Sequence, residues 1–166
     1  MKFNWGWLLR VLVLILLYLL LGNARSIQEN PFIPGAVIAV NMIIPVIAGI
    51  LFGKWAGLAV GIFGTFLNSL TPAGSFFEFL SVLPHGVMGF SAGHFKGRFL
   101  SVIVMLSLVI GHILNIIMFI SFKVMPITLL LNVSFWLALA YEIFTGAVAI
   151  IVIVALYRIC FEGKWH

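Results

Sequence analysis

Long apolar stretches alternate with short polar segments along the whole chain. Six of these stretches come close to the roughly 20 residues that a helix needs to cross a lipid bilayer. Their interiors hold few polar residues, so the pattern predicts an all-α membrane protein. We expect a bundle of six transmembrane helices that forms one integral membrane domain over residues 1–166. The predicted helices cover approximately residues 5–22, 35–53, 55–70, 76–95, 99–121 and 136–158.

Basic residues are divided unequally between the two ends of these helices. With a cytoplasmic N-terminus and six crossings, only Arg25 and Lys123 fall on the outer side. The cytoplasmic side receives the other seven of the nine basic residues: Lys2, Arg10, Lys54, Lys96, Arg98, Arg158 and Lys164. Since Lys and Arg concentrate in cytoplasmic loops, this bias predicts that both termini face the cytoplasm, in a bacterial-type cytoplasmic (plasma) membrane.

The first apolar stretch also has the features of a secretory signal peptide. Lys2 and Arg10 precede an apolar run from Val11 to Leu21, and the small residues Gly22 and Ala24 follow it. Cleavage there would leave five helices and an external N-terminus. A retained helix and a cleaved signal therefore stand as alternatives for residues 1–24.

Composition supports the membrane class. The chain is 64% hydrophobic and 8% charged, with a mean hydropathy of +1.28. Soluble domains average about 25% charged residues, so this chain cannot cover a water-facing surface and must turn apolar side chains toward lipid. The net charge of +5 is dispersed along the chain, which excludes the basic stripe of a nucleic-acid-binding protein.

Signatures of catalysis and metal binding are missing from the sequence. It contains no glycine-rich phosphate loop, no Gly-x-Ser-x-Gly motif and no His-Glu-x-x-His motif. His85 and His112 belong to different predicted helices and have no further ligand at suitable spacing, whereas zinc needs three or four converging ligands. We therefore expect neither an enzyme nor a metal protein.

The polar residues within the predicted helices concentrate in their outer halves. Because polar groups are costly in hydrocarbon, a one-sided set of them predicts a water-accessible pocket that opens to the outside. Its two carboxylates favour a cationic or amine-bearing heterocycle, for example a thiamine-like molecule. The predicted substrate-binding residues are Asn41, Asn68, Glu78, Asn115, Trp136, Tyr141 and Glu142.

Two of these residues have a structural alternative. Glu142 lies deep enough to need a cation or neutralisation, and a structural ion pair with Lys123 is as consistent with its position as ligand binding. Trp136 suits either an interfacial aromatic belt or stacking against a flat heterocycle.

Glycines follow a regular spacing on the third and fourth predicted helices. Small residues at this spacing let helix backbones approach closely in lipid. Either the glycines pack these helices against each other, or they dock another membrane subunit. The residues concerned are Gly57, Gly61, Gly64, Gly86, Gly89 and Gly93. Pro45 and Pro84 lie inside the second and fourth helices, where each can introduce a kink.

The stretch Ile43–Gly61 reads IIPVIAGILFGKWAGLAVG: a proline in an apolar run, a glycine-containing turn, then Gly-x-x-x-Gly. It resembles the second-to-third helix region of substrate-binding (S) subunits of energy-coupling-factor (ECF) vitamin and micronutrient transporters. The segment from Trp136 through Tyr141 and Glu142 to Arg158 is similar to their last helix. The resemblance extends to the number and order of helices over most of the chain.

This resemblance implies high-affinity capture of a vitamin-like micronutrient from the outside. The chain would then associate with a transmembrane coupling subunit and two cytoplasmic ATPases, which use ATP, while binding no cofactor itself. In such proteins the first external loop, here approximately residues 23–35, often covers the ligand. One departure concerns docking: many members carry Ala-x-x-x-Ala on the first helix, whereas Val11–Leu21 contains no small residue.

A small scaffold or assembly protein of the rod-shape-determining type is the competing interpretation. Such proteins have similar length and hydrophobicity and need no small-molecule ligand. On that interpretation, Glu78 and Glu142 would be replaceable without loss of any binding.

Overall fold

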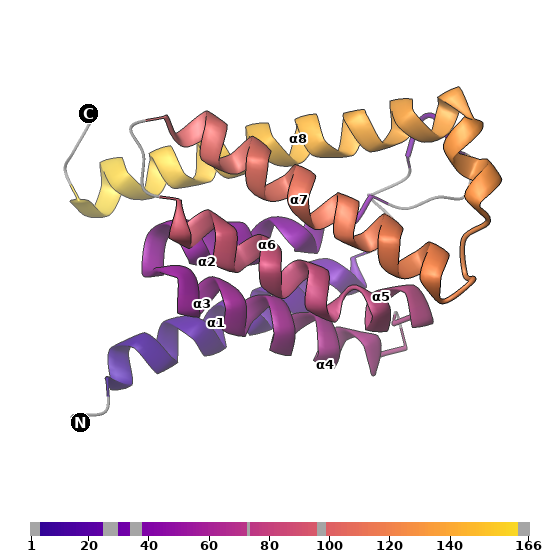
Figure 1. Ribbon diagram of the computed structural model, residues 1–166. Helices are drawn as coiled ribbons and strands as arrows, with labels where there is room; N and C mark the ends of the chain where they lie inside the picture. Colours follow the sequence, from indigo (N-terminus) through magenta and orange to yellow (C-terminus); the bar gives the residue numbers. More distant parts are fainter. Residues whose placement is uncertain (1–3, 25–29, 34–37, 73, 96–98, 163–166) are drawn as a thin grey trace.

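The computed structural model describes residues 4–24, 30–33, 38–72, 74–95 and 99–162, and within them the chain is all-helical (Figure 1). Its elements are α1 (Trp5–Asn23), η2 (Val40–Met42), α2 (Ile43–Phe52), α3 (Lys54–Ala59), η3 (Val60–Gly64), α4 (Thr65–Ser69), α5 (Phe76–Leu80), α6 (Val82–His94), α7 (Leu100–Ser121), η4 (Ile127–Leu131), α8 (Val133–Tyr157) and η5 (Arg158–Glu162).

The predicted helix positions are met to within a few residues in five of the six segments. The second segment is predicted to begin at residue 35, but the helix begins only at Val40. Ile38 and Ala39, just before it, are not helical. Residues 35–37 of that prediction lie outside the described part. The third, fourth and sixth segments are each built from consecutive helical pieces, two of which, η3 and η5, are π-helical.

The two prolines act as helix breaks. Pro84 has no N–H to donate to the carbonyl of Leu80, and α5 ends at Leu80 while α6 begins at Val82. Pro45 is the third residue of α2, and it likewise has no N–H to donate to the carbonyl of Asn41 in η2. A helix boundary thus lies within about one turn before each proline, close to Asn41 in the first case and to Glu78 in the second.

Helical segments run back and forth along one axis of the molecule (Figure 1). The start of α1 and the end of η5 lie at the same end of the molecule as the α2–α3 turn, and the α4–α5 and α7–α8 connections lie at the opposite end. Gly53 makes the α2–α3 turn with a φ of +93°, a conformation that residues with a side chain rarely adopt. The basic residues Lys2, Arg25, Lys96, Arg98 and Lys164 lie outside the described part.

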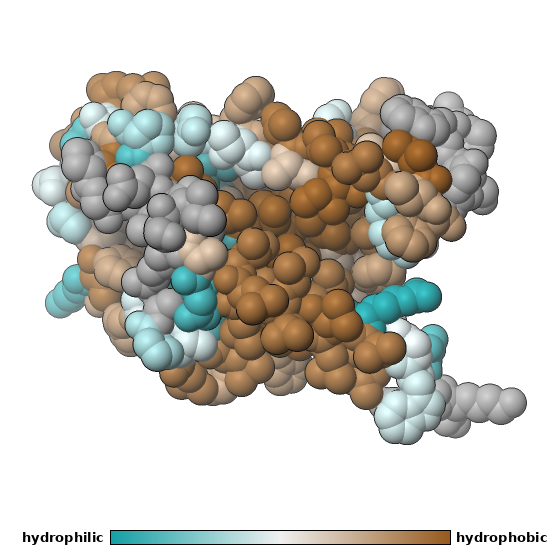
Figure 2. Space-filling view, turned by 180° about the vertical axis from the view of Figure 1, so that it is seen from behind, coloured by the Kyte–Doolittle hydropathy of each residue, from teal (hydrophilic) through white to brown (hydrophobic). Residues whose placement is uncertain are grey.

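The surface is that of a helical membrane protein. Within the described residues, three helices are long and apolar enough to cross a bilayer: Trp5–Asn23, Leu100–Ser121 and Val133–Phe161. Their outer faces expose leucine, isoleucine, valine and phenylalanine side chains. Figure 2 shows a broad hydrophobic surface over the middle of the molecule, with hydrophilic residues mostly toward its ends.

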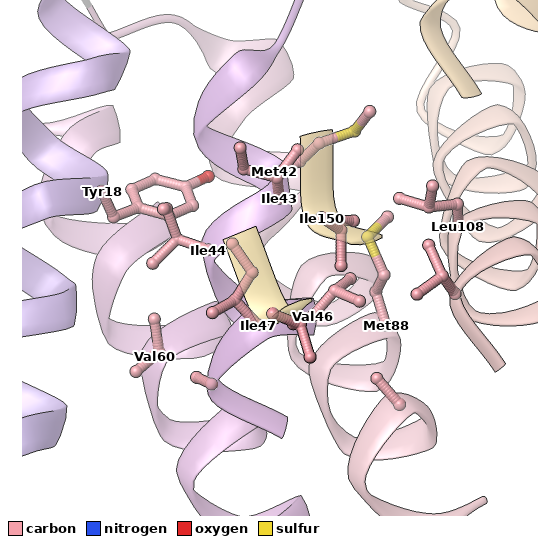
Figure 3. Packing of buried hydrophobic residues seen from close by; sticks show 14 of the residues in the cluster. Tyr18, Met42, Ile43, Ile44, Val46, Ile47, Val60, Met88, Leu108 and Ile150 are labelled. Atoms are coloured by element: carbon pink, nitrogen blue, oxygen red, sulfur yellow. The ribbon is translucent and has the colours of Figure 1, made fainter. Parts of the chain in front are cut away.

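Helix α2 is the centre of the core. All seven residues from Ile43 to Gly49 are buried, because α2 packs against α3, α6 and α8 and contacts α1 and α7. Figure 3 shows the aliphatic side chains gathered around it, with Val46, Met88 and Ile150 fully buried. Tyr18 is also fully buried at the edge of this cluster and carries a hydroxyl group into it.

The six regularly spaced glycines pack within the chain. A Cβ atom on Gly57 would lie 2.2 Å from the carbonyl oxygen of Gly89, and one on Gly89 would lie 2.3 Å from that of Gly57. A Cβ on Gly61 would meet the carbonyl oxygen of His85 at 2.3 Å, and Gly93 adjoins the backbone of Lys54. Gly64 and Gly86 are likewise buried, against Tyr18 and Ile62. Of the two alternatives for these glycines, packing within the chain is what the structure has at all six positions, and docking of another subunit there stays a prediction.

Replacing Gly89 with alanine is expected to destabilise the bundle by about 1–3 kcal/mol, because the added methyl group meets rigid backbone and the helices must separate. Thermal unfolding in detergent, followed by circular dichroism, measures the change. Gly146→Ala is the matched control, since a Cβ there would have its nearest neighbour at 3.7 Å. Equal unfolding temperatures for the two variants would contradict the close packing of α3 against α6.

Candidate functional site

Polar side chains from four elements meet around the hydroxyl group of Tyr18, in the last turns of α1. The Tyr18 hydroxyl lies 2.9 Å from Nδ1 of His85 on α6 and accepts a hydrogen bond of 2.9 Å from Oγ1 of Thr65, the first residue of α4. It donates to Oε1 of Glu78 on α5 over 3.2 Å. Oγ1 of Thr65 also lies 3.0 Å from His85 Nδ1. Tyr18, Thr65 and His85 are buried, with 0%, 0% and 3% of their surface exposed.

Glu78 is the half-buried end of this network. Its Oε1 accepts a second hydrogen bond, of 3.1 Å, from Nδ2 of Asn41 in η2. Ser75 caps α5 by accepting from the Glu78 backbone N–H at 3.2 Å, which fixes the helix turn that carries the carboxylate. The structure thus brings together the predicted residues Asn41 and Glu78, and it surrounds them with Tyr18, Thr65 and His85.

Glu142 is held by the same short stretch of chain that holds Glu78. The backbone N–H of Ala39 donates to Oε1 of Glu142 at 2.8 Å, and Asn41, two residues further on, donates to Glu78. The segment Ala39–Asn41 therefore lies between the carboxylates of α5 and α8. Both carboxylates are half-buried, and neither has an ion-pair partner among the residues that the structure describes.

The alternative of a structural Glu142–Lys123 pair is not realised in the described part of the chain. Lys123 lies in the turn after α7, where it adopts a positive φ of 58°, and it forms no ion pair with a described residue. Glu142 instead bonds to backbone. Within the described part of the chain, no positively charged group is thus an immediate partner of this carboxylate.

Residues 30–33 of the first connection lie against the outer end of α8. Asn30 Nδ2 donates to the Ala138 carbonyl oxygen at 3.5 Å, and the ring of Phe32 meets that of Tyr141 edge-on at 5.8 Å. Together with the bond from Ala39 to Glu142, these contacts attach the connection to one and a half turns of α8. The rest of the predicted covering loop, residues 25–29 and 34–35, lies outside the described part.

Asn68 and Asn115 are buried apart from the carboxylates. Asn68 accepts a hydrogen bond from Asn23 Nδ2 at 3.3 Å, and its own Nδ2 has no partner among the described residues. Asn115 lies on the buried face of α7, one turn after His112. Asn115 Oδ1 and His112 Nε2 are likewise buried and have no partner in the described part of the chain. No hydrogen bond joins Asn68 or Asn115 to Glu78 or Glu142 within the described residues.

Trp136 lines an apolar cavity rather than the polar cluster. This cavity lies between α7 and α8 and has a volume of about 430 Å³. The indole N–H of Trp136 donates to the Leu130 carbonyl at 2.7 Å, so the ring is fixed at the cavity rim. The lining residues are Val109, His112, Ile113, Ile116, Ile117, Leu130, Trp136, Leu139, Ala140 and Ile143.

Sequence reasoning missed Tyr18 and Thr65, and it considered His85 only as a metal ligand. The signal for Tyr18 was present: it is the one hydroxyl-bearing residue in the apolar run of the first helix, and isolated polar residues in membrane helices face the bundle interior. Thr65 follows the π-helical turn η3, and such irregular turns are frequent at functional sites.

No group of three or more metal-ligating side chains converges within the described residues. Comparisons of the chain with protein-family models, with curated proteins and with solved structures give no match.

Thr65→Val is expected to destabilise the protein by about 1–3 kcal/mol, since it removes a buried hydroxyl and leaves Tyr18 and His85 with one partner fewer. The measurement is again thermal unfolding in detergent. Thr145→Val is the matched control, because Thr145 Oγ1 bonds only to carbonyls of its own helix, at 2.8 and 3.2 Å. A loss no greater than that of the control would show that the polar cluster contributes nothing to folding.

Proposed function

We propose that this protein is a membrane-embedded capture subunit that binds a small cationic or amine-bearing micronutrient from the outside. Import would be driven by ATP hydrolysis in a separate coupling module. The observation that carries the proposal is the pair of half-buried carboxylates, Glu78 and Glu142, held on either side of the segment Ala39–Asn41 without a cationic partner among the described residues.

The carboxylates of Glu78 and Glu142 define the chemistry of the proposed ligand. A carboxylate in a membrane interior is costly unless a cation or several donors satisfy it. Among the described residues, each carboxylate receives hydrogen bonds from neutral groups only: from Tyr18 and Asn41 at Glu78, and from the Ala39 backbone at Glu142. A ligand with positive charge or several N–H groups would supply what is missing, and burial would strengthen the resulting charge-assisted hydrogen bonds.

The accessible side of this site is proposed to be the outer face of a six-helix, N-in and C-in protein. Two observations support the orientation. The polar cluster takes side chains from the last turns of α1 and from the short helices α4 and α5, which lie opposite the start of α1 and the end of η5 in Figure 1. Along the sequence, seven of the nine basic residues fall on the side that the six-helix arrangement predicts to be cytoplasmic. A micronutrient would then enter beside residues 30–33, which lie against α8 one turn from Glu142.

A separate module must supply energy, since the sequence has no phosphate-binding loop. The resemblance to S subunits implies a transmembrane coupling subunit and two cytoplasmic ATPases as partners. Since the spaced glycines pack within the chain, we propose that the contact with a coupling subunit uses other surfaces. The exposed apolar face of α1, which includes Leu9, Val13 and Leu16, is one such surface.

Native mass spectrometry of the gently purified protein is the decisive experiment. The expected result is a retained small molecule of defined mass that carries an amine or another cationic group. Release and identification of that molecule would name the substrate. A protein without any small molecule that instead retains a periplasmic or cytoskeletal partner would contradict the proposal and favour the scaffold interpretation.

Glu142→Gln and Glu78→Gln are each expected to weaken binding of the retained molecule by roughly 10- to 100-fold. The change removes the charge from a partly buried hydrogen bond, which contributes about 1.5–3 kcal/mol. Isothermal titration calorimetry with the identified molecule provides the affinities. Glu162→Gln, at the C-terminal end of the chain, removes a charge of the same type and is the matched control. Equal affinities for all variants would exclude a carboxylate site.

A further inference from the structure

The hydrogen bonds around Tyr18 have a fixed direction. A hydroxyl group carries one hydrogen, so it can donate only one full hydrogen bond. The hydrogen of Thr65 points to the Tyr18 oxygen at 2.9 Å, and the hydrogen of Tyr18 points to Oε1 of Glu78 at 3.2 Å. Both hydroxyl hydrogens are therefore committed along a path that ends at the carboxylate.

Nδ1 of His85 must supply the remaining hydrogen. It lies 2.9 Å from the Tyr18 oxygen and 3.0 Å from Thr65 Oγ1, and neither of these groups has a second hydrogen to donate to it. Since the hydrogens of Thr65 and Tyr18 are directed to other acceptors, a hydrogen bond between Nδ1 and either oxygen needs its hydrogen on Nδ1. A buried imidazole whose partners are hydroxyl groups is neutral, because a second proton would place an unpaired charge in the interior. His85 is thus assigned the tautomer with hydrogen on Nδ1 and a lone pair on Nε2.

We infer that His85 is a positioning residue for the Glu78 carboxylate. Its Nδ1–H begins a series of hydrogen bonds that runs through Thr65 and Tyr18 to Glu78. This series keeps the hydroxyl hydrogen of Tyr18 directed toward the carboxylate. In the other tautomer, the Nδ1 lone pair would attract the hydrogen of Tyr18, and Glu78 would lose one of its two side-chain donors. The tautomer of His85 is therefore coupled, through these hydrogen bonds, to whether Tyr18 donates to Glu78.

The packing of the helices holds these hydrogen-bonding groups in place. Gly61 adjoins the backbone of His85, and Gly64, directly before Thr65, adjoins the ring of Tyr18. All three hydrogen-bonding groups are buried, so water does not compete for them and each bond is stronger than at the surface. The role of His85 in ligand binding rests on the proposed function, but its tautomer is a property of the protein without any ligand.

The test is ¹⁵N nuclear magnetic resonance of histidine-labelled, ligand-free protein in detergent micelles. The resonances of His85 are identified by their loss in His85→Asn, which leaves the other three histidines unchanged. The expected wild-type spectrum has a protonated Nδ1 and an unprotonated Nε2. A hydrogen on Nε2 alone, or on both nitrogens, would overturn the inference.

The coupling to Glu78 is tested in the same way. Glu78→Ala removes the acceptor of the Tyr18 hydrogen, which is then expected to turn to His85 Nδ1 and shift the imidazole to the Nε2–H tautomer. Glu142→Ala is the matched control and is expected to leave the tautomer unchanged, since Glu142 bonds to Ala39 and not to these hydrogen-bonding groups. No shift in Glu78→Ala, or the same shift in both variants, would refute the coupling. Because no ligand is present, these outcomes are independent of whether the protein captures a micronutrient.

Discussion

Backbone contact between α3 and α6 is the constraint on which the rest of the structure depends. Gly57 and Gly89 leave no room for even a methyl group between the two helices. In lipid, where apolar side chains gain little by leaving the solvent, such close approach is a principal source of helix association. Close packing continues along η3, where Gly61 adjoins the backbone of His85 on α6 and Gly64 adjoins the ring of Tyr18 on α1. The packing of small residues therefore also positions the polar cluster.

That cluster shows how polar groups are accommodated inside an apolar bundle. Breaks at the two prolines and the π-helical turn η3 interrupt regular helix near Asn41, Glu78 and Thr65. These irregular turns let side chains from different helices converge on one hydroxyl group. The network satisfies Tyr18, Thr65 and His85 with one another, whereas the two carboxylates keep only neutral donors among the described residues. This difference separates a structural polar core from the part of the cluster that we assign to ligand capture.

Much of the fold could be predicted because hydrophobicity and length act locally. Apolar runs bounded by Lys, Arg, Gly and Pro defined most helical segments to within a few residues. The start of the second segment was wrong, since Ile38 and Ala39 are apolar yet not helical, with the Ala39 N–H bonded to Glu142. A contact with a residue 103 positions away leaves no mark in the local pattern.

The sequence by itself determined the class of protein, the order of its helices and the polar residues available for a site. It could not decide which of those residues meet, because helix rotation and contact depend on side chains far apart in the chain. Tertiary structure joined Asn41 to Glu78, left Asn115 and Trp136 elsewhere, and added Tyr18, Thr65 and His85. It also turned the spaced glycines inward, since two helix backbones can approach closely only where both lack side chains.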